Sequence, residues 1–287
     1  MENIYTGRQI ALFTDVHGMY EPLESIMYDI KRRGITEIYS LGDSIIDGPS
    51  PVEVLKLMQE NNVSQVLGNS ECYVMLGTEP FNYISESRKE LIYWTLSKIS
   101  DYLDYLNSSK ASIDLDIGKK KVALCHFIND IRWDYSLRST WTYQRNYGFG
   151  KGAQQFLYTN SPEYQKNLDY YLQHTGILEG KGCKASYEEP LFHGKSVIEY
   201  DDVFQGHVHF EMEDELENTK IHTIRAAGMG WQESDKDLAG YIILKEKIKG
   251  GFDTEKVYVP FDKEKLMSTI YYSDMPEKSR TLRFLRW

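Results

Sequence analysis

The sequence predicts an α/β fold, and three observations support this class. Between residues 10 and 67, short apolar runs alternate with amphipathic stretches in the order strand, helix, strand, helix, strand. Polar residues collect where each of these runs ends. Further along the chain, short runs alternate apolar and polar side chains, which is typical of antiparallel strands. We therefore expect a parallel sheet with right-handed crossovers in the first half and mostly antiparallel strands in the second.

The first half contains three expected strands and two expected helices. The strands are apolar runs that enter polar loops, at residues 10–13, 37–41 and 63–67. Residues 22–33 carry apolar side chains at i, i+3, i+4 and i+7 and end on a basic turn, and Gly34 supplies the stop. A second helix opens near Pro51, because proline suits the first turn of a helix.

The second half is expected to be mostly strands. A helical pattern over residues 87–106 precedes a hairpin, whose strands are expected at 113–117 and 122–125. Later apolar runs predict four more strands, at residues 203–205, 220–224, 240–244 and 256–259. The acidic run 211–217 is expected to form a solvated loop or a sheet edge.

A long segment rich in aromatic residues separates two of these strands. Residues 129–196 are too many for a plain connection in a compact fold, and they interleave tyrosines and tryptophans with arginines. We expect an insertion, partly helical, within a single domain that spans residues 1–287.

Composition limits the class of protein. The chain has 33 Lys and Arg against 43 Asp and Glu, a formal net charge of −10, which argues against a nucleic-acid duplex or an anionic membrane as partner. Its three cysteines form no Cys-x-x-Cys pair, which favours a reducing compartment. No apolar run approaches the ~20 residues of a membrane span, so a cytoplasmic location is expected. The oligomeric state is left open.

Seven potential metal ligands follow the expected strands. They are Asp15, His17, Asp43, Asn69, His126, His207 and His209. Imidazole, carboxylate and amide oxygen suit Mn, Fe, Zn or Ni, and the absence of thiolates argues against a structural zinc site. If the backbone stays extended, residues two apart point to the same side, so Asp15 with His17 and His207 with His209 would each aim two ligands into one space. Seven ligands suit two divalent or trivalent transition metal ions that share a bridging carboxylate.

These motifs resemble those of the calcineurin-like metallophosphoesterases. The resemblance is carried by the stretches 15–18 (Asp-Val-His-Gly), 42–49 with its Gly-Asp and Asp-Gly-Pro, 68–71 (Gly-Asn-Ser-Glu), His126 after a strand, and 206–209 (Gly-His-Val-His). It is densest over residues 9–71 and does not cover the insertion. The resemblance implies a four-layer αββα sandwich, in which two mixed sheets are flanked by helices.

The resemblance also implies a division of the ligands between two ions. Asp15, His17, Asp43 and His209 would hold one ion, and Asp43, Asn69, His126 and His207 the other. Asp43 would bridge, and Asn69 would also contact the phosphate, so these two are the candidate catalytic residues. The implied reaction is direct attack of a metal-bound hydroxide on a phosphate ester.

One position departs from the commoner family pattern. A histidine proposed to assist the leaving group usually follows Gly-Asn, and here that position is Ser70. A serine hydroxyl is a poor general acid, which favours substrates with good leaving groups, such as a small phosphodiester or a phosphoanhydride of the dinucleoside polyphosphate type. Glu71 or a side chain of the insertion are the alternatives for the missing acid.

The insertion offers a candidate substrate-binding surface. Arg132, Trp133 and Arg138 would bind a nucleotide-like substrate, since arginines recognise phosphates and aromatic rings stack on bases. The simpler alternative is that these aromatics are core residues.

Two other functions remain open at this point. One is a phosphomonoesterase, including a Ser/Thr protein phosphatase, and the other is a non-catalytic binding scaffold on the same fold. The presence of all seven ligand residues argues against the scaffold.

Overall fold

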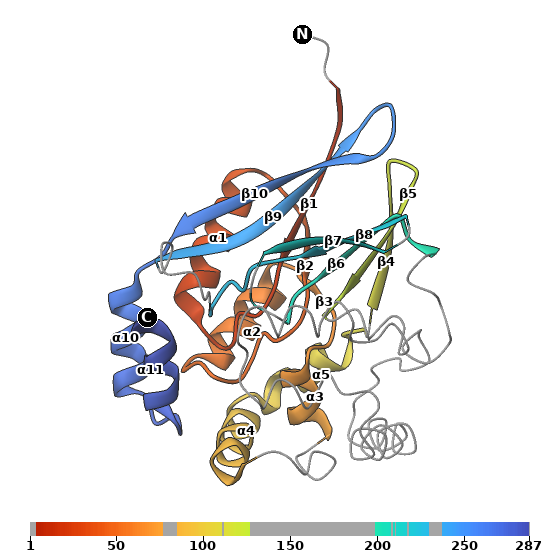
Figure 1. Ribbon diagram of the computed structural model, residues 1–287. Helices are drawn as coiled ribbons and strands as arrows, with labels where there is room; N and C mark the ends of the chain where they lie inside the picture. The colour runs from red at the N-terminus through yellow and green to blue at the C-terminus, as the bar shows by residue number, and fades with distance from the viewer. Residues whose placement is uncertain are drawn as a thin grey trace.

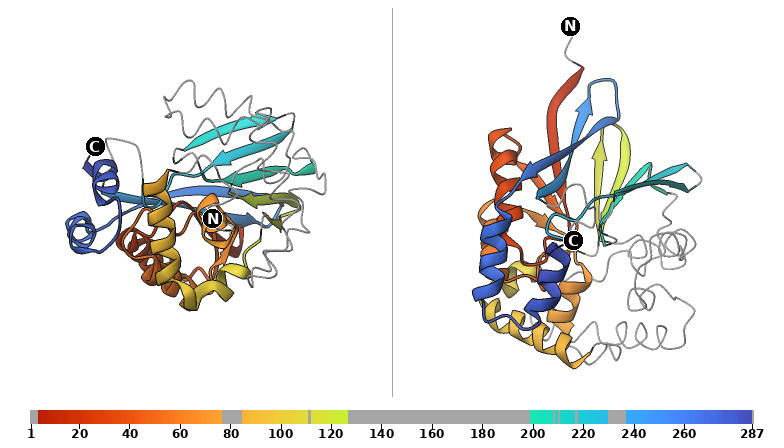
Figure 2. Two further views of the ribbon diagram at one scale, coloured as in Figure 1. Left: turned by 90° about the horizontal axis from the view of Figure 1, so that it is seen from below. Right: turned by 60° about the vertical axis from the view of Figure 1, so that its left-hand side comes forward.

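Two five-stranded sheets lie face to face, and helices cover the outer face of one of them (Figure 1; Figure 2). The structure is a computed structural model that describes residues 4–76, 85–110, 112–126, 199–207, 209, 211–216, 218–229 and 237–286. The predicted α/β class, with two mixed sheets flanked by helices, is confirmed.

The first sheet has the strand order β10-β9-β1-β2-β3. Its strands are β1 (Tyr5–Phe13), β2 (Glu37–Ser40), β3 (Ser64–Gln65), β9 (Leu238–Lys247) and β10 (Phe252–Pro260). The strands β1, β2 and β3 are parallel, as the alternation of strands and helices predicts. The hairpin of β9 and β10 extends this sheet with antiparallel pairs on the other side of β1.

Helices α1 (Tyr20–Arg32) and α2 (Pro51–Glu60) connect the parallel strands and cover their outer face. The apolar face of α1 packs on this sheet: Leu23, Ile26 and Ile30 share one cluster with Phe13 of β1 and Val54 of α2. Because the same i, i+3, i+4 spacing is visible in the sequence, the predicted bounds of α1 lie within two residues of the observed ones.

The second sheet has the strand order β4-β5-β6-β8-β7. Its strands are β4 (Ser112–Ile117), β5 (Lys120–Cys125), β6 (Asp202–Gln205), β7 (Met212–Leu216) and β8 (Thr219–Thr223). This sheet is mixed: β4–β5 and β7–β8 are antiparallel, as expected for the second half of the chain, whereas β5–β6 and β6–β8 are parallel. Alternation along a strand shows which side is buried and carries no information on strand direction. The acidic run forms the edge strand β7.

The two sheets share a core between them. Leu12 of β1, Leu124 of β5 and Phe204 of β6 are fully buried and belong to one cluster. This contact fixes the ends of β1, β5 and β6 relative to one another, which positions the loops that follow them.

The remaining helices lie beside the first sheet (Figure 1). They are α3 (Asn69–Leu76), α4 (Glu86–Lys98), a short 3₁₀ helix (Ser100–Tyr102), α5 (Leu103–Asn107), α10 (Lys263–Tyr272) and α11 (Lys278–Arg286). The expected helix over residues 87–106 is therefore divided after Lys98, although Ile99 and Leu106 still turn inward and are fully buried. Within the described ranges, no helix is both long and apolar enough to span a membrane.

Candidate metal centre

All seven predicted ligand residues follow strand ends and lie in one cluster. Asp15 and His17 follow β1, Asp43 follows β2, Asn69 begins α3 after β3, His126 follows β5, and His207 and His209 follow β6. The carboxyl ends of these parallel strands meet at the same edge of the two sheets, as an open α/β sheet requires of a ligand site.

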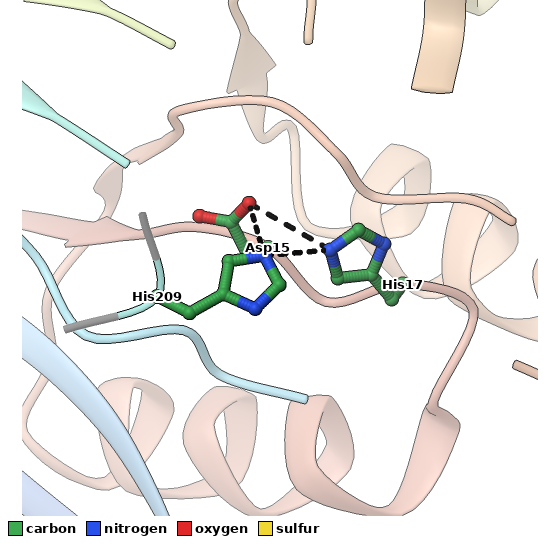
Figure 3. Close-up of side chains that lie close together, drawn as sticks. All are labelled: Asp15, His17 and His209. Carbon is green, nitrogen blue, oxygen red and sulfur yellow. Dashed lines mark hydrogen bonds and ion pairs between the residues drawn. The ribbon is translucent and has the colours of Figure 1, made fainter. Parts of the chain in front are cut away.

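Asp15, His17 and His209 form the first group of donor atoms (Figure 3). The Oδ1 atom of Asp15 lies 3.3 Å from His209 Nε2 and 3.7 Å from His17 Nε2, and the two ring nitrogens lie 3.1 Å apart. The other carboxylate oxygen, Oδ2, accepts hydrogen bonds from the Thr14 hydroxyl and from the backbone N–H of His207. These bonds hold Asp15 so that Oδ1 faces the two imidazoles.

Asn69, His126 and His207 form the second group. Asn69 Oδ1 lies 3.1 Å from His126 Nε2 and 3.1 Å from His207 Nδ1, and these two ring nitrogens are 3.2 Å apart. The opposite ring nitrogen of His126, Nδ1, donates to the backbone carbonyl of Leu41 at 2.8 Å. A neutral His126 therefore carries its proton on Nδ1 and turns the lone pair of Nε2 toward the Asn69 oxygen. His126 Nε2 and Asn69 Oδ1 are then both acceptors, and their separation of 3.1 Å fits a cation that binds to both.

Asp43 lies between the two groups. Its Oδ2 atom is 3.8 Å from His17 Nε2 and 3.6 Å from His126 Nε2, and its Oδ1 accepts a hydrogen bond of 2.7 Å from the backbone N–H of Ser70. Asp43 also belongs, with Asp15 and His126, to a second set of donor atoms that all lie within 4.8 Å of one another. A carboxylate in this position can contact ions in both groups.

Burial favours neutral rings at His17 and His207, whereas at His209 burial would lower the pKa but the adjacent Asp15 raises it above its ordinary value. Burial lowers the pKa of His17, and burial together with the neighbouring His126 lowers the pKa of His207 to about 4. Burial would raise the pKa of Asp15, but the adjacent His209 holds it below its ordinary value. Metal ions require neutral imidazoles and ionised carboxylates, so this donor set fits borderline divalent cations.

The backbone at the ligands is not extended, so one sequence-based expectation is wrong. Asp15 and His17 both have φ of 52°, and His207 and His209 have φ of 69° and 65°. Strand β1 ends at Phe13, two residues before the first ligand. Asp15 and His17 still converge, because the loop that follows β1 is held against a neighbouring loop rather than continuing as a strand, whereas His207 and His209 face different groups of donors.

Backbone hydrogen bonds join the two loops that carry these ligands. The N–H groups of Asp15, His17 and Gly18 donate to the carbonyls of Gly42, Asp43 and Ser44, at 3.0, 2.9 and 2.8 Å. This pairing satisfies the backbone in a left-handed conformation, which non-glycine residues adopt at a cost.

Glu71 holds the loops of Asp43 and Asn69 together. It is fully buried, and its carboxylate accepts from the backbone N–H groups of Asp43, Ser44 and Gly68 at 2.8–2.9 Å. Burial and the nearby Asp43 raise its pKa to about 7. Ser70 is fully buried as well. Neither side chain faces solvent, so Glu71 is a positioning residue rather than the acid that replaces the missing histidine.

Two further polar residues were not assigned a role from the sequence. Asp47 Oδ2 lies 3.7 Å from His17 Nδ1, and its carboxylate is held by both terminal nitrogens of Arg88 on α4. Burial would raise the pKa of Asp47, but Arg88 holds it below its ordinary value. Asp47 is part of the resembling stretch 42–49, whereas Arg88 lies in no motif.

The predicted substrate-binding residues are outside the described part of the chain. Arg132, Trp133 and Arg138 belong to the insertion, so their expected contact with the metal centre stays a prediction.

Solved structures identify the fold. A metallophosphoesterase from Sphaerobacter thermophilus superposes with a TM-score of 0.58 over 96% of this chain and 98% of its own, at 18% identity. The chain has the calcineurin-like metallophosphoesterase fold. Hypothetical protein PH1004 from Pyrococcus horikoshii OT3 also superposes on this chain, with a TM-score of 0.62 over 96% of this chain and 97% of its own, at 15% identity.

A curated relative matches part of the chain. The uncharacterized protein MJ0912 from Methanocaldococcus jannaschii is 36% identical over 118 residues, which are 41% of this chain and 48% of that protein. The match thus spans about half the length of this relative. No protein-family model matches the chain.

Proposed function

We propose that this protein is a two-metal phosphoesterase that hydrolyses a small phosphodiester or phosphoanhydride. The observation that carries the proposal is the position of Asp43, whose Oδ2 faces His17 at 3.8 Å and His126 at 3.6 Å. One carboxylate oxygen between two groups of metal-ligating side chains is the arrangement that a binuclear centre needs. The metallophosphoesterase fold supports the same reaction class.

Hydrogen bonds from the backbone orient the two carboxylates, so that one oxygen of each remains for the ions. In both Asp15 and Asp43, one oxygen accepts a hydrogen bond from a backbone N–H and the other faces the imidazoles. When bound, two divalent ions would supply an activated water nucleophile and neutralise charge on the phosphoryl group. Asn69 offers an amide N–H₂ in addition to its oxygen, and in our proposal it donates to a phosphate oxygen.

The leaving group decides the substrate class. Ser70 and Glu71 are fully buried, and the carboxylate of Glu71 is occupied by three backbone N–H groups. Neither side chain reaches an ester oxygen to protonate it. A substrate whose leaving group is stable as an anion, such as a nucleotide in a phosphoanhydride or the activated alcohol of a diester, needs no such proton. We therefore place a nucleotide-like substrate, including a dinucleoside polyphosphate, ahead of a phosphoserine or a sugar phosphate.

A substrate comparison tests this proposal. Purified protein loaded with Mn²⁺ is assayed with bis-p-nitrophenyl phosphate, p-nitrophenyl phosphate and diadenosine tetraphosphate, and its metal content is measured. We expect close to two ions per chain and a higher kcat/KM for the diester and the anhydride than for the monoester. Preference for the monoester would favour a phosphomonoesterase. Less than one ion per chain with no hydrolysis would favour a binding scaffold.

A further inference from the structure

The back of the His17 ring faces a carboxylate. His17 Nε2 points into the donor cluster, where it lies 3.1 Å from His209 Nε2. Nδ1 points the opposite way, toward Asp47 Oδ2 at 3.7 Å. This Nδ1 is buried, and within the described part of the chain it has no hydrogen-bond partner. A neutral imidazole that offers the Nε2 lone pair must carry its proton on Nδ1, and a buried N–H needs an acceptor.

Asp47 is fixed by two helices from different parts of the chain. Arg88 of α4 binds both oxygens of its carboxylate, one of them through Nη2 at 2.9 Å. Thr281 of α11 donates its buried hydroxyl to the backbone carbonyl of Asp47 at 2.7 Å. Asp47 itself has a left-handed backbone with φ of 75°. The carboxylate therefore cannot turn away without breaking this part-buried ion pair.

We propose that Asp47 and Arg88 are a positioning pair that orients His17 toward the metal centre. The inference rests on the proposed function, because it assigns these residues to the same metal site. The present gap of 3.7 Å exceeds a hydrogen bond by about 0.5–1 Å, and a small rotation of the imidazole closes it. A histidine that donates its second N–H to a carboxylate is held in one tautomer and becomes a more basic ligand.

In this proposal, the planar guanidinium of Arg88 contributes its geometry as well as its charge. A guanidinium binds both oxygens of Asp47 at once and fixes the plane of the carboxylate, whereas an ammonium is a point charge that binds one position. If the pair acts by charge alone, lysine can replace Arg88 without loss of Mn²⁺ affinity. If the pair acts by orienting the His17 ring, the lysine variant binds Mn²⁺ more weakly.

Mn²⁺ binding tests the inference without an activity assay. Metal-stripped wild type, Asp47→Asn and Arg88→Lys are titrated with Mn²⁺ by calorimetry. We expect the Kd of Asp47→Asn to rise by about 10- to 100-fold, and that of Arg88→Lys to rise severalfold in the same direction. Asp47→Asn preserves side-chain size, and Arg88→Lys preserves charge.

Asp29→Asn is the matched control for a purely structural effect. Asp29 and Asp47 are each 6% exposed, and Asp29 is also bound by arginine, through Arg32 in the last turn of α1 and Arg33 directly after it. We expect Asp29→Asn to lower the midpoint of thermal unfolding and to leave the Mn²⁺ affinity within about twofold of wild type.

The tautomer of His17 is a second measurement, made on the metal-free protein. Long-range ¹H–¹⁵N spectra are expected to place the His17 proton on Nδ1 in wild type and to show a mixture of tautomers in Asp47→Asn. Wild-type Mn²⁺ affinity in both Asp47→Asn and Arg88→Lys, with the tautomer unchanged, overturns the inference and leaves the proposed function standing. Failure of wild type itself to bind Mn²⁺ overturns both.

Discussion

Gly68 allows the loops of the metal centre to pack closely, and substituting it with alanine tests this packing. Gly68 precedes Asn69, and its backbone lies against the loop of Asp43. A Cβ atom at position 68 would lie 2.3 Å from Asp43 Oδ1 and 2.4 Å from Asp43 N. Its neighbours here are the backbone and a carboxylate that is already bonded to Ser70, so no flexible side chain can move aside.

The size of the expected effect follows from these distances. Ordinary contacts of a Cβ atom begin near 3.4 Å, so the loop of Asp43 must move by about 1 Å to accept the methyl group. A misplacement of this size costs about a hundredfold in rate when it affects the reacting geometry. Forcing a methyl group into a packed site also costs about 1–3 kcal/mol of stability. For a chain of this size, that corresponds to a fall of roughly 2–5 °C in Tm.

Gly240→Ala is the control, because a Cβ at position 240 meets only ordinary contacts. Its closest neighbours, in Arg225 and Tyr258, lie 3.5 Å away. Hydrolysis of bis-p-nitrophenyl phosphate, Mn²⁺ content and thermal unfolding are measured for both variants. We expect Gly240→Ala to match wild type and Gly68→Ala to lose about a hundredfold in kcat/KM together with part of its metal. Equal activity and metal content in the two variants would refute the packing of the Asp43 and Asn69 loops described above.

Two further substitutions test separate parts of the structure. Asp43→Asn is expected to leave less residual phosphoesterase activity than Asn69→Ala, by at least about tenfold, since Asp43 Oδ2 lies within 3.8 Å of a ring nitrogen in each group of donors; similar rates would contradict its bridging position. His222 lies between Asp202 Oδ1 at 2.9 Å and Glu213 Oε2 at 2.5 Å; burial would lower its pKa, but these carboxylates raise it above the ordinary 6.5. The charged ring therefore stabilises the fold fully below about pH 6.5, and this contribution is lost as the pH rises through the raised pKa. In urea unfolding, His222→Gln is expected to cost more free energy near pH 6 than near pH 9, and an equal cost at both would contradict the charged state.

Much of the first sheet and of the ligand set follows from the sequence, because both depend on local patterns. The apolar face of α1 and the glycine after it are visible as spacing, and the spacing determines which face is buried. Asp15, Asp43 and Asn69 come directly after strands or strand-like runs, and parallel strands bring their carboxyl ends to one edge. Their convergence is therefore a consequence of topology.

Other features depend on contacts that no local pattern encodes. Arg88 binds Asp47 across 41 positions, and only the packing of α4 beside the first sheet brings the two together. The direction of β6 depends on the route of the chain before it, which alternation does not describe. Helix α10 was missed although its signals are local: Asp262 caps it by accepting from Lys265 N–H, and Leu266 and Ile270 share its buried face.

The sequence-based description of the ligands is right about which residues meet and wrong about the backbone that brings them together. Asp15, His17, Asp43, His207 and His209 all have left-handed φ values between 52° and 69°. At roughly 1 kcal/mol each, this conformation costs about 5 kcal/mol, comparable with the whole free energy of unfolding of a small domain. Such a cost persists only where surrounding groups impose the conformation; the paired loops and the three bonds to Glu71 do so for Asp15, His17 and Asp43, and the bond from the His207 N–H to Asp15 does so for His207. Without these contacts, the residues would adopt the extended backbone that they prefer, and the donor atoms would move apart. The donors are therefore held together by contacts between loops and not by the local preferences of their own residues.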